Sequence, residues 1–327
     1  MKLRWIDSTG ATERELAELP ALRTRADGFL WLDIPEWSET AQAILRDEFH
    51  FHPMAIAKSR DRNHVPRLHV YPDHVFTVVH APEIGAGGHV HYLELDQFIA
   101  ADFLITVHGP ISPKVPLEAA LRETSTVAAR MDSGRLHAAS PFGLSYAIIS
   151  SIARKEADMV AEIAREVGLL EQRVMAESDE DPQKFLSQLF AARHELLAIK
   201  TMAEQGGEIY RRAIKLTGFA SPEALELMKD MLDQYETVAH IADSQRLFLM
   251  GVTEFYRART DTKMTIAAER LAVIAAITLP ITSLSSVVGM NVIVNGSTHW
   301  VALSILLLIM LIMSLILLRW AQRQGWL

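Results

Sequence analysis

Residues 271–318 read LAVIAAITLPITSLSSVVGMNVIVNGSTHWVALSILLLIMLIMSLILL, a stretch of 48 residues without one Asp, Glu, Lys or Arg. It contains two apolar runs, 271–290 and 300–318, separated by the polar residues Asn295-Gly296-Ser297-Thr298. A helix of about 20 apolar residues, rising about 1.5 Å per residue, spans the hydrocarbon core of a bilayer. A buried helix pair in a soluble protein is the alternative, but such helices usually keep one polar face. The sequence therefore predicts a transmembrane hairpin.

Charged residues are confined to the first 270 residues and the last nine, so a large water-soluble body precedes the membrane segment. The net charge of −8 disfavours nucleic acid as a partner and favours cations, and the absence of Cys excludes disulfides and thiolate metal sites. Basic residues flank both predicted spans and are absent from the loop between them, which places both termini in the cytoplasm by the positive-inside rule. These residues are Arg257, Arg259, Lys263, Arg270, Arg319 and Arg323.

The amino-acid composition of the water-soluble body changes near residue 140. Residues 1–140 are predicted to form a cytosolic α/β domain, because short apolar and β-rich runs alternate with helical patterns. Gly85-Ala86-Gly87-Gly88 is predicted to be a turn between two strands. The predicted strands lie within 29–34, 67–80 and 91–108, and the predicted helices within 39–49 and 117–130.

Residues 141–270 are predicted to form a cytosolic helical stalk, because they are rich in Ala, Leu, Glu, Arg and Met. Ser221-Pro222-Glu223 is a good helix start, and only Gly251 interrupts the pattern before the membrane. One helix is therefore expected to run from Pro222 through the first span, and a helix of that length needs neighbours. The predicted fold class is α+β: an α/β domain, a stalk, and a hairpin with a short cytosolic tail over 271–327. The predicted stalk helices cover 141–175, 182–217 and 222–270.

The first predicted span carries one distinctive face. Toward its outer end this face is small and polar, and it bears no charge, so it suits a cation that keeps its water shell, as Mg²⁺ does. Small and hydroxylated residues also mediate packing between membrane helices, and this alternative stays open. Two helices cannot enclose an aqueous path, so the hairpin is either an anchor or one subunit's share of a pore. The face comprises Thr265, Ala268, Leu271, Ala275, Leu279, Thr282, Ser286 and Gly289.

The tripeptide Gly289-Met290-Asn291, which closes the first span, resembles the Gly-Met-Asn motif of the CorA family of divalent-cation transporters. Its context strengthens the resemblance, because Pro280 lies nine residues upstream and Trp300 opens the second span. The chain ends in Gly325-Trp326-Leu327, which is similar to the family's C-terminus. Further upstream, Trp31-Leu32-Asp33 and the run 103–108 resemble its cytosolic domain.

The resemblance implies a homopentameric funnel in the bacterial inner (plasma) membrane, which transports Mg²⁺ and is not an enzyme. Asn291 would form a ring at the outer mouth, Gly289 and Met290 would shape that turn, and Leu271 and Leu279 would match the hydrophobic constrictions. Thr282 would match a pore hydroxyl of the family. The resemblance also implies regulatory Mg²⁺ held between subunits by acidic residues, and no organic cofactor. Glu226, Asp230 and Asp233 share one face of the stalk helix and are the candidates, although a solvated acidic face also explains them.

One departure from the family leaves the ion open. Mg²⁺-transporting members carry acidic residues after the motif, whereas the predicted outer loop 292–299 carries none. The zinc-transporting ZntB branch also lacks them, so Zn²⁺ transport, with proton coupling, is the first alternative to Mg²⁺, Co²⁺ or Ni²⁺. A membrane-anchored metal sensor without conduction is the second. His89 and His91, with His80 nearby in sequence, could serve such a sensor, but polar histidines at a strand edge are the more common explanation of this pattern.

Overall fold

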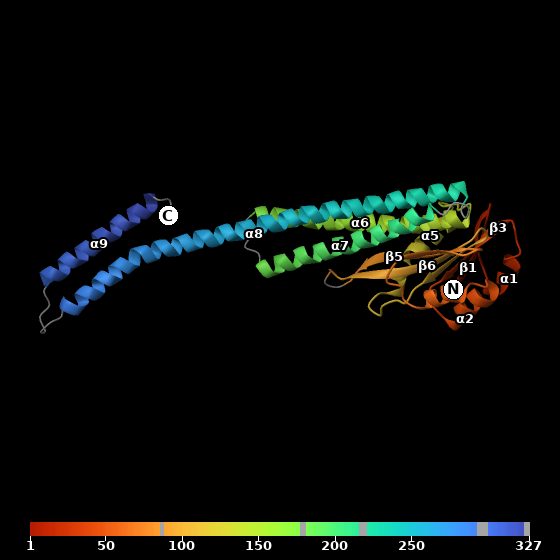
Figure 1. Cartoon of the computed structure of the whole chain (residues 1–327), viewed down its shortest axis with the longest axis horizontal. Helices are drawn as coiled ribbons and strands as arrows, with labels where there is room; N and C mark the ends of the chain where they lie inside the picture. The colour runs from red at the N-terminus through yellow and green to blue at the C-terminus, as the bar shows by residue number, and fades with distance from the viewer. Residues whose placement is uncertain (86–87, 177–180, 216–220, 293–299, 324–327) are drawn as a thin grey trace. The chain divides into compact units, whose positions relative to one another are not determined.

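The computed structural model describes residues 1–85, 88–176, 181–215, 221–292 and 300–323 (Figure 1). They divide into two compact units, Met1–Val252 and Thr253–Leu327. The first unit holds a β-sheet and a bundle of long helices, and the second holds the end of one of these helices and one further helix. The finer division into 1–140, 141–270 and 271–327 stays a prediction.

Seven strands form one mixed sheet in the order β2-β1-β3-β7-β6-β5-β4. Strands β3 and β7 pair in parallel, and the other neighbouring pairs are antiparallel. The predicted strand runs appear as β3 to β7, whereas β1 and β2 lie outside them, because charged residues interrupt the apolar pattern there. The strands are β1 (Lys2–Asp7), β2 (Gly10–Arg14), β3 (Gly28–Ile34), β4 (Arg67–Val70), β5 (Val75–Ile84), β6 (Val90–Ile99) and β7 (Phe103–His108).

The core of the sheet domain lies between one sheet face and short helical segments. Leu32, Phe76 and Phe98 project from the strands and pack with Leu45 and Phe51 of the connecting segments, and none of them exposes more than 3% of its surface. Helix α6 lies on the other face, where the Ser145 hydroxyl donates to the Gln97 side-chain oxygen at 2.6 Å. The short segments over this core are η1 (Leu16–Glu18), α1 (Leu19–Leu22), α2 (Glu39–Ala43), η2 (Ile44–Glu48) and α3 (Pro53–Arg60). Two others follow β7, namely α4 (Leu117–Ala120) and α5 (Arg122–Asp132), and α5 packs against α6.

Three long helices begin at the residues that the sequence predicted. They are α6 (Pro141–Met175), α7 (Pro182–Ala213) and α8 (Pro222–Val292). The cap side chain before each proline accepts a backbone N–H: Ser140 from Gly143 at 3.1 Å, Asp181 from Gln183 at 2.9 Å and Ser221 from Ala224 at 3.2 Å. Proline tolerates the first turn because its missing N–H would lack a helical partner there anyway.

The second unit contains the part of α8 that follows Thr253, and helix α9 (Trp300–Arg323). Helix α8 continues through Pro280. Among the described helices, α8 is the one that is long and apolar enough to cross a membrane, and only 6% of its apolar 18-residue segment is buried. A shorter apolar segment, Leu307–Ala321, lies within α9.

The bundle of the first unit forms because α6, α7 and the start of α8 each bury one apolar stripe. The approach of α7 to α8 requires glycine at position 206, where an added Cβ would lie 2.8 Å from the Tyr235 ring. The Tyr235 and Tyr210 rings stack with their centroids 6.0 Å apart. The interior includes Val160, Ile163, Val167, Leu189, Leu196, Ile199, Met228, Met231 and Val238.

One carboxyl group is buried inside this bundle. Glu156 of α6 is fully buried, and neither of its side-chain oxygens has a hydrogen-bond partner among the described residues. Burial therefore raises the pKa of Glu156 well above its ordinary value of 4.5. Its neutral form stabilises the folded bundle fully below about pH 4.5, and this contribution is lost as the pH rises through the folded-state pKa.

Replacing this group by Glu156→Gln should remove the titration. Relative to the variant, the wild type should lose about 1.4 kcal/mol of unfolding free energy per pH unit above pH 4.5, until the folded-state pKa is reached. Thermal unfolding of the full-length protein in detergent, followed by circular dichroism between pH 5 and 8, measures the difference. The control is Glu162→Gln, since Glu162 is exposed on α6 and pairs with Arg165. Parallel pH profiles for all three proteins would contradict the assignment.

Candidate functional site

The predicted pore face of α8 lies on one side of the helix in the second unit. At about 100° per residue, the six positions from 271 to 289 fall within an arc of about 80°. All six are exposed, and Leu271 and Leu279 each expose 66% of their surface. The face carries apolar residues toward its start and hydroxyls toward its end. The six residues are Leu271, Ala275, Leu279, Thr282, Ser286 and Gly289.

The opposite side of α8 is the more buried one. Val273 exposes 3%, and Ile277 and Leu284 are half-buried. These three positions lie roughly 180° from the predicted pore face at about 100° per residue. Helix α9 runs back beside α8 (Figure 1) and buries one stripe of its own, which includes Met310, Met313, Ser314, Leu317 and Ala321. Helix α9 therefore covers the back of α8 and leaves the predicted face open.

Threonine hydroxyls on α8 are oriented by the helix backbone. The Thr282 hydroxyl donates to the Thr278 carbonyl at 2.8 Å, and the Thr278 hydroxyl donates to the Ile274 carbonyl at 2.8 Å. Each hydroxyl proton is therefore used in a hydrogen bond to the helix backbone, and the lone pairs of the hydroxyl oxygen remain available to accept hydrogen bonds. Pro280 has no N–H, so the carbonyl four residues earlier, at Ala276, loses its helical partner. Such oxygens suit the water shell of a cation better than they suit an anion.

The motif tripeptide lies in the last turn of α8, which ends at Val292. Gly289 is exposed, and no heavy atom lies within 4 Å of a Cβ built there. The side chains of Met290 and Asn291 lie outside the described part of the structure, as do residues 293–299 of the predicted outer loop. The roles of the three motif residues therefore stay predictions.

Two of the three acidic candidates meet in one groove of the first unit. Asp230 and Asp233 of α8 line a groove of about 860 Å³ against α6. The Asp230 carboxylate accepts hydrogen bonds from the Tyr146 hydroxyl and the Gln234 amide, each at 2.6 Å. The bond from Tyr146 to Asp230, together with burial, raises the pKa of Tyr146. Glu226 is absent from the groove lining and pairs with Lys229 at 2.6 Å.

The groove does not by itself complete a metal site. Arg130 and Arg154 line it together with the two carboxylates, so its charge is mixed. Among the described residues of this single chain, no group of three or more His, Asp or Glu residues is placed to hold a metal ion. A cation at Asp230 and Asp233 would need ligands from water or from a second copy of the chain.

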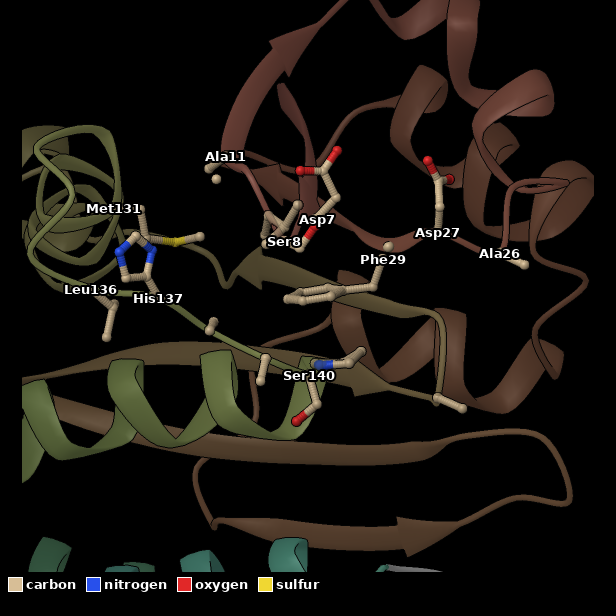
Figure 2. Close-up of a pocket in the computed structure, with 17 residues that line it drawn as sticks. Asp7, Ser8, Ala11, Ala26, Asp27, Phe29, Met131, Leu136, His137 and Ser140 are labelled. Carbon is tan, nitrogen blue, oxygen red and sulfur yellow. The ribbon is translucent and has the colours of Figure 1, made fainter.

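A second cavity, of about 480 Å³, lies where β1, β3 and the segment before α6 meet (Figure 2). Asp7 and Asp27 line it, but both carboxylates are engaged locally. Asp7 accepts the Thr9 hydroxyl at 2.5 Å and the Thr9 backbone N–H at 2.8 Å, which lower the pKa of Asp7, and Asp27 pairs with Arg25. Nothing in this cavity resembles a prepared cation site.

A third cavity gathers histidines that are far apart in the sequence. His80, His89 and His91, which the sequence singled out, all line it. His64 from the loop before β4 and His194 from α7 join them. No sequence pattern links His64 and His194 to the other three, because only the folding of the loop before β4 and of α7 around the β5–β6 hairpin brings them together.

Comparison with known proteins places this geometry in a family. The family model described as "CorA-like Mg2+ transporter protein" matches residues 26–323. The Bacillus subtilis protein YfjQ, which is named as a candidate metal ion transporter, is 24% identical over 281 residues. The alignment covers 83% of this chain and 81% of YfjQ.

Solved structures share the fold. The CorA magnesium transporter of Methanocaldococcus jannaschii has a TM-score of 0.82 at 14% identity, over 100% of this chain and 99% of its own. The full-length CmaX protein has a TM-score of 0.76 at 16% identity, over 99% and 97%. The ZntB cytoplasmic domain from Vibrio parahaemolyticus has a TM-score of 0.59 at 13% identity, over 80% and 98%. At these identities the likeness shows the fold, and it confirms the predicted α+β class with a long helical stalk.

The family model spans most of the chain, including the segment with the charge-free face of α8. Transporters of this family move metal ions across membranes, and this confirms the prediction that the chain is not an enzyme. The chain belongs to the CorA-like Mg²⁺ transporter family and is a membrane metal ion transporter.

Proposed function

We propose that the chain forms a homopentameric channel in the bacterial inner (plasma) membrane that passes hydrated Mg²⁺ down the membrane potential, with Co²⁺ and Ni²⁺ as further substrates. The observation that carries this proposal is the exposed, charge-free face of α8 opposite the side that α9 covers. It includes Thr282 and Ser286 and leads to Gly289. Mg²⁺ gives up its water reluctantly, so neutral oxygens that contact its hydration shell suit it.

The proposal of an oligomer rests on surfaces that a single subunit leaves uncovered. Two helices cannot enclose a pore, so several copies must contribute α8 to a shared lining, with α9 outside. The stalk part of α8 also exposes large apolar side chains, among them Ile241 at 41%, Leu247 at 56% and Phe248 at 42%. Exposed apolar side chains of this size along a helix favour a protein interface. Neighbouring subunits would cover them in the pentamer.

Transport needs no cofactor in this scheme. A divalent cation gains about 4.6 kcal/mol per 100 mV of membrane potential, twice the value for a single charge. The basic residues before α8's apolar window and at the end of α9, such as Arg270 and Arg319, support cytoplasmic termini. Entry of cations toward a negative cytoplasm is then downhill.

Zn²⁺ transport of the ZntB type is the second candidate, and one observation favours it. Residues 292–299 carry no Asp or Glu, so no fixed negative charge in this segment raises the local concentration of divalent cations. Proton coupling would then supply part of the driving force. Met290, as in the usual motif of the Mg²⁺ branch, supports the first candidate instead.

Asp230 and Asp233 are the proposed regulatory Mg²⁺ ligands. They line one groove, and the carboxylate oxygens that Tyr146 and Gln234 leave free remain available as hard ligands. A subunit interface over this groove would complete the coordination with water and residues of the neighbouring copy. Glu226, which pairs with Lys229, is the weakest of the three candidates.

Asn291→Ala should lower potential-driven Mg²⁺ flux into proteoliposomes by about tenfold or more, because it removes an oxygen that contacts the hydrated ion. The matched control is Asn295→Ala. Asn295 lies outside the motif, so this variant should conduct as the wild type does. The assay runs Mg²⁺ and Zn²⁺ in parallel at a fixed potential. Entry of Zn²⁺ alone would favour the zinc candidate, and no flux of either ion would leave an anchored sensor.

Because the chain has no Cys, single cysteines can test which face of α8 is wet. Ser286→Cys places a thiol on the proposed pore face, and Ser304→Cys places one on an exposed position of α9. A charged thiol reagent should block flux through the first variant and leave flux through the second unchanged. Block of both variants, or of Ser304→Cys alone, would contradict the proposed lining.

Asp230→Asn and Asp233→Asn should raise the Mg²⁺ concentration that protects the full-length protein from limited trypsin digestion by severalfold, since each removes one charged ligand. Glu226→Gln is the control and should leave the protection curve in place. Equal curves for all four proteins would mean that regulatory Mg²⁺ binds elsewhere or not at all.

A further inference from the structure

A cavity of about 530 Å³ lies in the first unit between the β5–β6 hairpin, the loop before β4, and α7. Every titratable side chain that reaches it, apart from the phenol of Tyr92, is a base. These side chains come from four separate places in the sequence and meet only in the fold. They are Arg62, His64, His80, His89, His91 and His194.

No described carboxylate lines this cavity, although the chain has 40 acidic residues against 32 Lys and Arg. The other polar lining residues, Asn63, Thr201 and Gln205, are uncharged. An electropositive cavity of this kind is unexpected in a protein with a net charge of −8. Its lining is rich in hydrogen-bond donors and includes a fixed positive charge, which is the chemistry that recognises an anion.

The guanidinium of Arg62 is largely free. Arg62 donates from Nη2 to the Tyr92 carbonyl at 3.4 Å and forms no ion pair with a described carboxylate. Burial raises the pKa of Glu94, and the nearby Arg62 charge opposes that shift. By contrast, Arg60, two residues earlier, pairs with Asp61 at 2.9 Å. Arginine offers a planar fork of donors that matches a phosphate group. Arg62 is therefore the residue best placed to bind one.

Hydrogen bonds to Asn63 fix the loop that carries Arg62. The backbone N–H and side-chain amide of Asn63 donate to the two oxygens of Glu94, at 2.7 and 2.6 Å. His80, which exposes 5%, donates from Nε2 to the Asn63 carbonyl at 2.8 Å. Glu94 thus directs its charge toward Asn63, and Arg62 and His64 flank a fixed residue. The site is organised before any ligand arrives.

We infer that this cavity binds a small phosphorylated anion, with Arg62 as its principal charged contact and the histidines as further donors. Its volume lies within the range of about 300–1,000 Å³ that is typical of small-molecule sites. His89 and His91, whose ring centroids lie 4.7 Å apart, form one wall of the cavity. The inference is independent of the ion that the channel passes.

A transition metal is the rival occupant, since His is a common metal ligand. Among the described residues no three of the histidines are grouped to hold a metal ion, and the Arg62 charge repels one. The two occupants also differ in their response to pH. Metal binding displaces protons from imidazoles and weakens on acidification, whereas an anion binds protonated imidazoles more tightly.

The charges around the histidines set the direction of this response. Burial, with Arg62 and His64 nearby, lowers the pKa of His80, and burial, His89, Lys114 and Arg62 lower the pKa of His91 despite Glu83. Beside His194 on α7, burial and the nearby Glu166 raise the pKa of Glu195, which favours the uncharged form of its carboxyl. These surroundings favour the neutral form of His80 and His91, whereas a bound anion would favour their protonated form.

The test is isothermal titration of the full-length protein in detergent with inorganic pyrophosphate and with inorganic phosphate, in metal-free buffer at pH 6, 7 and 8. Pyrophosphate should bind, and its affinity should rise about two- to tenfold per unit fall in pH as imidazoles take up protons. Arg62→Gln should weaken binding by about tenfold or more. The control Arg67→Gln changes an exposed arginine five residues away, outside the cavity lining, and should bind as the wild type does.

His91→Gln, on β6, is the second variant and should flatten the rise in affinity on acidification, since burial and Arg62 lower the pKa of His91. Thermal unfolding of each variant shows whether it is folded. No pyrophosphate or phosphate binding to the wild type at any of the three pH values would overturn the inference, as would equal loss in Arg62→Gln and Arg67→Gln. Binding of Zn²⁺ that weakens on acidification, without anion binding, would assign the cavity to a metal instead.

Discussion

Helix α8 runs without a break from Pro222 to Val292, and the rest of the structure depends on that continuity. A single helix can pass through two different environments, because its backbone hydrogen bonds are satisfied within the helix whether its side chains contact protein or lipid. Before Val252 it buries Met231 and Tyr235 in a bundle, and after Thr253 it presents an open face opposite α9. Asp230 and Ser286 are therefore residues of one continuous helix, although they belong to different units.

The features that the sequence could predict are local ones. The long helices begin at Ser140-Pro141, Asp181-Pro182 and Ser221-Pro222, because each cap and its proline act within one turn. Strand β1 was not predicted, because Lys2 and Arg4 interrupt its apolar pattern. Arg4 is nevertheless buried, with its guanidinium 5.4 Å from the Trp31 ring centroid. Only the pairing of β1 with β3 creates that position, and pairing across about 25 residues leaves no local signal.

The difference between local patterns and contacts between distant segments also explains which site residues could be predicted. The spacing of Leu271, Leu279 and Ser286 predicts one helix face, and the structure keeps these residues exposed together, although their role in a pore stays a prediction. The i, i+4, i+7 spacing also grouped Glu226 with Asp230, but the partners of these side chains differ. Tyr146, from another helix, holds Asp230 in the groove, whereas Lys229 draws Glu226 away. A helical wheel predicts the side on which a residue lies and not the partner that it finds there.

In its described parts the protein keeps fixed charge away from the proposed path and concentrates it elsewhere. A carboxylate on the open face of α8 would hold a divalent cation too tightly for rapid release, whereas neutral oxygens bind the hydrated ion weakly at several levels. The carboxylates of Asp230 and Asp233 line the stalk groove, where slow release would suit the regulatory role that we propose. The cationic lining around Arg62 forms a third environment, which repels the transported ion and is open to its counter-anions. Conduction, sensing of cations and binding of anions would then use separate surfaces of one chain, and none would compete with another for its ligand.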